Sequence, residues 1–233
     1  MFFFDPLYLI LMAPVLAFTL YAQYRVKSAF RKYSQVAPHS GLTGAQASRR
    51  LLDGNNLQDV AIDKVQGNLS DNYDPRARIL HLSPEVYEGL SLAALGVAAH
   101  EAGHAMQDAR GYWPMRLRAG LVPAANFGSQ MAIPLFFVGL LVVGWFHSSA
   151  GYLIMNIGIA VFAIAVLFQI VTLPVEFNAS RRAMAQLAES GIISDDEYRP
   201  TRKVLSAAAL TYVAAAASAV VTLLYLILRG RND

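Results

Sequence analysis

Three long stretches of the chain carry no charged side chain, and they constrain its fold more than any other feature. Asp, Glu, Lys and Arg are absent from Leu7 to Tyr24, from Ala119 to Val175 and from Leu205 to Leu228. A membrane-spanning helix needs about 20 mainly apolar residues, so the middle stretch has room for two spans and each of the others for one. The sequence therefore predicts a mainly α, multi-pass membrane protein with about four transmembrane helices. The expected spans are about 3–24, 127–146, 151–173 and 205–228.

These spans divide the chain into five expected segments. They are an N-terminal transmembrane anchor (1–24), a polar domain (25–118), a transmembrane helical hairpin (119–175), a second polar segment (176–204) and a C-terminal transmembrane helix with its tail (205–233). An even number of crossings separates the two polar segments, so both are expected on the same side of the membrane. Their basic residues predict that this side is the cytosol, because cytosolic loops carry an excess of Lys and Arg.

Local signals in the first polar segment predict the order helix, strand, strand, helix. Thr43 and Gln46 form a capping box ahead of a helix through Leu52. Residues 60–65 and 78–82 are expected to form short strands, separated by turn residues that include 71–75. Proline in its favoured first position opens a helix after Ser83. Residues 89–91 are expected to interrupt that helix, which resumes to about Ala109.

Residues 100–104 read His-Glu-Ala-Gly-His, the H-E-x-x-H pattern, and fall inside the expected 91–109 helix. His100 and His104 are four residues apart and therefore share one helix face, so both imidazoles can reach one metal ion. Glu101 lies beside that face, where it can hold a water bound to the metal. The alternative is a buried helix with two hydrogen-bonded histidines and a paired glutamate. The chain has no cysteine, so any metal must be held by nitrogen and oxygen.

A catalytic zinc ion also needs a third protein ligand and one open position, and Glu176 is the candidate ligand. It is the only acidic residue between Asp108 and Glu189, and it directly follows an apolar span. A lone carboxylate in this position is costly unless it has a partner, and the topology returns it to the side that holds His100. The alternative is a solvated glutamate at the membrane surface.

Two blocks of sequence carry a resemblance to a known family. The blocks are HEAGHAMQ at 100–107 and LPVEFNASRRA at 173–183, supported by YDP at 73–75 and LHLS at 80–83. Together they resemble the YugP-type neutral zinc metallopeptidases of prokaryotic membranes over essentially the whole chain. The resemblance implies a small α+β gluzincin-like metallopeptidase domain in 25–118. It also implies one Zn²⁺ per chain held by His100, His104 and Glu176, with Glu101 as the catalytic residue.

These features favour a membrane-embedded zinc endopeptidase, in which Glu101 activates a zinc-bound water and passes the proton to the leaving amine. The expected partners are the lipid bilayer and a protein or peptide substrate that is membrane-associated or unfolded. A net charge of +3 is too small and too dispersed to favour nucleic acid. An inactive zinc-binding membrane scaffold is the alternative, and the intact Glu101 argues against it. A metal transporter ranks last, because the expected spans contain no acidic or basic residue.

Several further residues have weaker expected roles. Arg78–Leu82 is the candidate edge strand to which an extended peptide could add, with an ordinary core strand as an equal alternative. Asn178 and Ser180 are candidates to orient Glu176 by hydrogen bonds. Four other side chains are considered as oxyanion donors, although a structural role is favoured for each: His81, Arg181, Arg182 and Tyr198.

Overall fold

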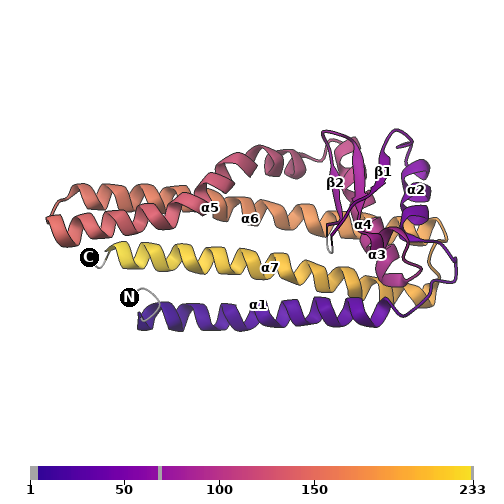
Figure 1. The fold of residues 1–233 in the computed structure, drawn as a ribbon, viewed down its shortest axis with the longest axis horizontal. Helices are drawn as coiled ribbons and strands as arrows, with labels where there is room; N and C mark the ends of the chain where they lie inside the picture. The colour runs from indigo at the N-terminus through magenta and orange to yellow at the C-terminus, as the bar shows by residue number, and fades with distance from the viewer. Residues whose placement is uncertain (1–4, 68–69, 232–233) are drawn as a thin grey trace. The chain divides into compact units, whose positions relative to one another are not determined.

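The computed structural model describes residues 5–67 and 70–231, and it shows a mainly α chain with one small sheet (Figure 1). In chain order the elements are α1 (Pro6–Tyr33), α2 (Gly44–Gly54), β1 (Ala61–Lys64), β2 (Asn72–Asp74), β3 (Ile79–Leu82), α3 (Pro84–Tyr87), α4 (Leu92–Ala109), α5 (Trp113–Phe146), α6 (Ala150–Glu189) and α7 (Asp195–Arg231). The expected fold class is confirmed. The chain forms two compact units, which are described separately: Met1–Tyr21 with Leu117–Leu173 and Tyr212–Asp233, and Ala22–Arg116 with Pro174–Thr211.

Among the described residues, four helices are long and apolar enough to cross a membrane: α1, α5, α6 and α7. Each continues well beyond the span expected from its charge-free stretch. Helix α6, for example, has 40 residues and ends at Glu189. A charged residue limits a membrane span but not a helix, and the residues after 176 are rich in the good helix formers Ala, Leu, Arg and Gln. Glu176 consequently lies on the same continuous helix as the apolar run before it.

In the first unit, small residues let the long helices approach closely. A Cβ atom added to Gly128 of α5 would lie 2.6 Å from the carbonyl oxygen of Val161 on α6. Such contacts between glycine and a facing backbone are typical of helices packed in a membrane. In the same unit, the Tyr225 hydroxyl of α7 donates a hydrogen bond to Asp5 at 2.8 Å.

The sheet belongs to the second unit and has the strand order β1-β3-β2. Strand β3 pairs parallel with β1 and antiparallel with β2. The expected strands at 60–65 and 78–82 are therefore present as β1 and β3. Strand β3 is the central strand, so of the two alternatives for Arg78–Leu82 the edge strand is wrong and the core strand holds. The cause is β2, which forms from residues with turn character because β3 offers it a pairing partner distant in sequence.

The helices around the sheet follow the local signals. Thr43 caps α2, and the reciprocal capping box with Gln46 is formed. Ser91 caps α4, which ends near Ala109, while Gly111 adopts a left-handed φ of 62°. Leu80 and Leu82 of β3 are fully buried and belong to the same apolar core as the buried residues of α4. Helix α4 is thus held inside the unit by apolar packing on several sides.

Helix α4 packs against α6 with almost no space between the two backbones. A Cβ atom added to Gly103 would lie 2.6 Å from the carbonyl oxygen of Ala179, which is closer than real Cβ atoms approach. Glycine at 103 is therefore a requirement of this helix crossing.

We expect Gly103→Ala to destabilise the protein by about 1–3 kcal/mol, because the added methyl group meets backbone that cannot move aside. Gly96→Ala on the same helix is the matched control. Its Cβ would lie 3.4 Å from the Thr201 side chain, an ordinary contact, and alanine favours a helix by about 1 kcal/mol over glycine. Thermal unfolding in detergent measures both variants. Equal stability of the two would mean that the crossing at Gly103 is looser than described.

A second prediction concerns Tyr73, whose hydroxyl donates a 2.9 Å hydrogen bond from β2 to the carboxylate of Asp108 on α4. We expect Tyr73→Phe to lose about 1–2 kcal/mol of unfolding free energy. Tyr87→Phe is the control, because no hydrogen bond of the Tyr87 hydroxyl is found in the described part of the chain.

The contribution of the Tyr73 hydroxyl to the unfolding free energy should fall as the pH rises. Burial, and then the hydrogen bond to Asp108, raise the pKa of Tyr73 above its ordinary value of 10.0. A raised pKa means that the stabilisation is complete below pH 10.0 and is lost as the pH rises further, by up to about 1.4 kcal/mol per pH unit. The wild type should therefore lose its advantage over Tyr73→Phe above that pH. A constant difference between the two proteins would contradict the assignment.

Candidate metal centre

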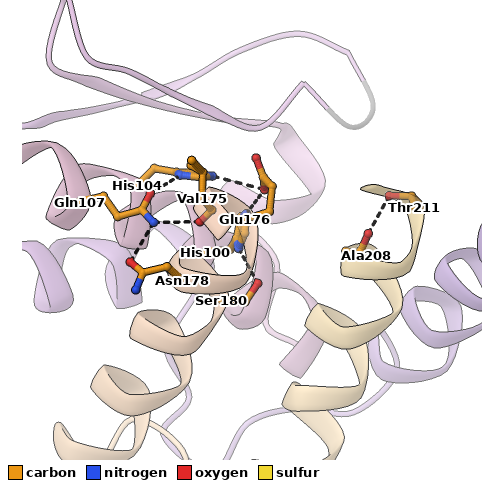
Figure 2. A network of polar contacts seen from close by, with 9 residues as sticks. All are labelled: His100, His104, Gln107, Val175, Glu176, Asn178, Ser180, Ala208 and Thr211. Carbon is orange, nitrogen blue, oxygen red and sulfur yellow. Dashed lines mark hydrogen bonds and ion pairs between the residues drawn. The ribbon is translucent and has the colours of Figure 1, made fainter. Parts of the chain in front are cut away.

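Helices α4 and α6 bring polar side chains together at the site (Figure 2). The contacts pair residues in opposite order along the two helices, so the helices run antiparallel here. His100 contacts Ser180, and one turn further along α4, His104 faces Glu176, one turn back along α6. The glycine contact between Gly103 and Ala179 lies in the same register. Residues 105–175 separate the histidines from Glu176 in the chain, so the site is assembled by this one helix crossing.

The two imidazoles and the carboxylate converge on one point. Nε2 of His100 lies 3.1 Å from Oε2 of Glu176, and Nε2 of His104 lies 3.6 Å from the same oxygen. The rings are nearly perpendicular, with centroids 4.8 Å apart. A tetrahedral zinc ion at about 2.0–2.1 Å from each ligand would hold its ligand atoms about 3.3 Å apart. The two nitrogen–oxygen distances bracket that value, and all three ligand atoms lie within 4.8 Å of one another, so the three residues fit a zinc ion.

The surroundings of this group favour a bound cation. Glu176 is 2% exposed and His104 is 8% exposed. Burial lowers the pKa of His104, but its contact with Glu176 and the nearby charge of Glu101 outweigh burial and raise that pKa above its ordinary value. Two carboxylates beside a buried imidazole thus create a site that stabilises added positive charge.

Glu101 lies directly after His100 on α4 and is 9% exposed. In the described residues, its carboxylate forms no hydrogen bond or ion pair with the protein. Its charge is among the causes that raise the pKa of His104, which agrees with its place on the same helix. A carboxylate next to the ligand group that is not bound to another side chain remains able to hold a water molecule.

The histidines are held by partners on their other ring nitrogens. The Ser180 hydroxyl lies 3.0 Å from Nδ1 of His100, and Oε1 of Gln107 lies 3.0 Å from Nδ1 of His104. Gln107 in turn donates to the carbonyl oxygen of Val175 and to Oδ1 of Asn178 (Figure 2). Such outer contacts orient metal-binding imidazoles.

Two expectations about these outer contacts need correction. The Ser180 hydroxyl contacts Nδ1 of His100, and Oδ1 of Asn178 accepts hydrogen bonds from Gln107 and Arg182, so in the described contacts neither residue holds Glu176. Gln107 was not predicted, although a sequence signal existed. It lies three residues after His104, on the same helix face, and it is a polar residue in an otherwise apolar helix.

The other candidate side chains have partners or positions elsewhere. Arg182 donates from Nε to Asn178, and Tyr198 packs against the apolar core. His81 is on β3 between Leu80 and Leu82, which enter the core, so alternation along the strand directs it to the opposite face of the sheet. Neither these two contacts nor the direction of His81 supports the role of an oxyanion donor.

Comparison with known proteins agrees with this geometry. The family described as "Putative neutral zinc metallopeptidase" matches residues 8–231. The chain is also 44% identical over 230 residues to the "Putative membrane protease YugP" of Bacillus subtilis, a match that covers 97% of this chain and 99% of that protein. No solved structure matches the chain.

The family match spans almost all of the chain, and it includes both helices that supply the His-His-Glu group. The YugP match extends over nearly the full length of both proteins. With its four apolar helices and this potential metal-binding group, the chain belongs to the neutral zinc metallopeptidase family as a membrane protein.

Proposed function

We propose that the chain is a zinc-dependent endopeptidase that binds one zinc ion through His100, His104 and Glu176. The observation that carries this proposal is the convergence of these three side chains from two helices, with ligand atoms within 4.8 Å of one another. Three nitrogen and oxygen ligands leave one tetrahedral position for water or substrate, which distinguishes a catalytic zinc site from a structural one.

Zinc bound in this site would supply a Lewis acid that makes a water nucleophilic near neutral pH and polarises the scissile carbonyl. Glu101 acts as the general base: its carboxylate takes up the proton of the attacking water and later donates it to the departing amine. Ser180 and Gln107 keep His100 and His104 in orientation through the Nδ1 atoms. Burial of Glu176 excludes water from the ligand side of the site.

An inactive zinc-binding scaffold is the second candidate. It would need the three ligands but would have no use for a carboxylate at Glu101. The position of Glu101, buried beside the histidines and without a protein partner in the described residues, therefore favours the enzyme.

Substrate binding would use an edge of the sheet. Strands β1 and β2 occupy the two edges, because β3 is paired on both sides. An extended segment of polypeptide could add to a free edge through main-chain hydrogen bonds, with little dependence on its sequence. This mode favours unfolded or membrane-associated protein segments as substrates.

The first test changes the base and a ligand separately. Glu101→Gln should keep zinc but lose peptide hydrolysis by at least about 100-fold, because the amide cannot accept a proton. Glu176→Ala should instead weaken zinc binding. Metal content by mass spectrometry and cleavage of an unfolded protein measure both properties in detergent. Wild-type turnover by Glu101→Gln would refute the mechanism, and a wild-type protein with zinc but no peptidase activity would favour the scaffold.

We also propose that residues 25–118 and 176–204 face the cytosol, with the turn after α5 on the other side. The support is the basic character of these segments and the even number of crossings between them. The chain has no native cysteine, so Ser148→Cys introduces a unique label site in that turn. An impermeant thiol reagent should label it in intact cells. If Ser148→Cys is labelled only after the cytosolic side is opened, the protein has the opposite orientation. In the proposed orientation, Ser70→Cys should be labelled only after the cytosolic side is opened.

A further inference from the structure

We infer that Gln107 is a positioning residue that fixes His104 in the tautomer with its proton on Nδ1, so that the Nε2 lone pair faces Glu176. This inference deepens the proposed function and rests on zinc binding by His104. It follows from the hydrogen bonds around Gln107, which is fully buried between α4 and α6.

The orientation of the Gln107 amide is determined by its neighbours. Its Nε2 lies 2.8 Å from the carbonyl oxygen of Val175 and 2.9 Å from Oδ1 of Asn178. A main-chain carbonyl only accepts hydrogen bonds, so the NH₂ end of the amide must point to Val175. Rotating the amide by half a turn would place two oxygens against each other in a buried place, which is costly. The oxygen end of Gln107 therefore faces His104.

An amide oxygen also only accepts hydrogen bonds, so Nδ1 of His104 must carry the proton at its 3.0 Å contact with Gln107. In the neutral imidazole this leaves Nε2 without a proton. Nε2 of His104 faces Oε2 of Glu176 at 3.6 Å. Nε2 is thus ready to bind a cation.

The other histidine is held differently. Nδ1 of His100 faces the Ser180 hydroxyl, which can rotate to donate or to accept. Nε2 of His100 lies 3.1 Å from Oε2 of Glu176, a distance at which an imidazole proton can be donated to the carboxylate. His100 can therefore form a hydrogen bond to Glu176 through Nε2, whereas the contact with Gln107 fixes Nδ1 of His104 as a donor.

Gln107 is itself held from α6. Oδ1 of Asn178 accepts hydrogen bonds from both Gln107 and Nε of Arg182, the second at 2.7 Å. Because two donors point at Oδ1, the Asn178 amide is oriented as well. Arg182 and Gln107 thus both donate to Asn178, and His104 donates to Gln107, so the orientation of the Gln107 amide depends on two residues, Asn178 and Arg182, that do not touch the metal ligands.

The test uses the full chain in detergent, freed of metal and titrated with Zn²⁺ against a competing chelator. Gln107→Met keeps the length of the side chain but removes both polar ends, and it should weaken zinc binding by about 10–100-fold. Gln186→Met is the matched control, a half-buried glutamine on α6 that bonds to Asn55, and it should bind zinc as the wild type does. Asn178→Asp offers acceptors to both of its donors and should stay close to wild type, while Asn178→Leu should weaken binding.

A spectroscopic measurement reports the tautomer directly, even if a variant folds poorly. Long-range ¹H–¹⁵N spectra of the metal-free wild type, labelled at its 5 histidines and recorded at alkaline pH, should show His104 with its proton on Nδ1. In Gln107→Met the other tautomer should appear. Wild-type His104 protonated on Nε2, or Gln107→Met with undiminished zinc affinity, would overturn the inference and leave the proposed peptidase intact. If zinc binds with the expected variant effects but the protein does not hydrolyse peptides, the proposed peptidase is overturned and the inference about Gln107 is kept.

Discussion

The close antiparallel contact of α4 with α6 is the constraint on which the rest of the site depends. Gly103 allows the Ala179 backbone to come within a distance that no side chain would permit. Only at this separation can His104 face Glu176 while Gln107, one turn on, reaches the Val175 carbonyl. A wider crossing would separate the ligand atoms and would leave buried polar groups without partners, each at a cost of about 1–3 kcal/mol. The close approach of the two helices thus explains why residue 103 of the motif is glycine.

The interior of this crossing is polar, but its hydrogen bonds are organised. Gln107 is fully buried and uses both of its NH₂ protons and its oxygen. Networks of this kind rigidify a site when every member has a partner and destabilise it when one is missing. The carboxylates of Glu176 and Glu101 differ in whether other side chains contact them. Glu176 is engaged by both histidines, whereas the Glu101 carboxylate is not used by other side chains in the described part of the chain. The contacts of Glu176 suit a metal ligand, and the unoccupied carboxylate of Glu101 suits a general base.

Much of this arrangement could be predicted from the sequence where the signals are local. The spacing of His100 and His104 on one helix, the Thr43 capping box and the four long apolar helices follow from periodicity and side-chain chemistry. The pairing with Glu176 needed a topological argument, because residues 105–175 intervene. Features that depend on a distant partner were missed or misplaced: β2, the central position of β3, and the groups bonded to Asn178 and Ser180. A strand with turn-like residues, or a hydroxyl with several neighbours, shows its role only when the partner is known.

The order of the ligands along the chain has a consequence for how the site forms. His100 and His104 precede the expected membrane hairpin and Glu176 follows it on α6, so the full ligand set requires the hairpin to be made before the helices can cross. Without Glu176, the Nε2 atoms of the histidines would lack their acidic partner, and two nitrogen ligands alone do not provide the three that catalytic zinc requires. Placing the third ligand on a helix that begins as a membrane span therefore links completion of the metal centre to the same packing that folds the chain.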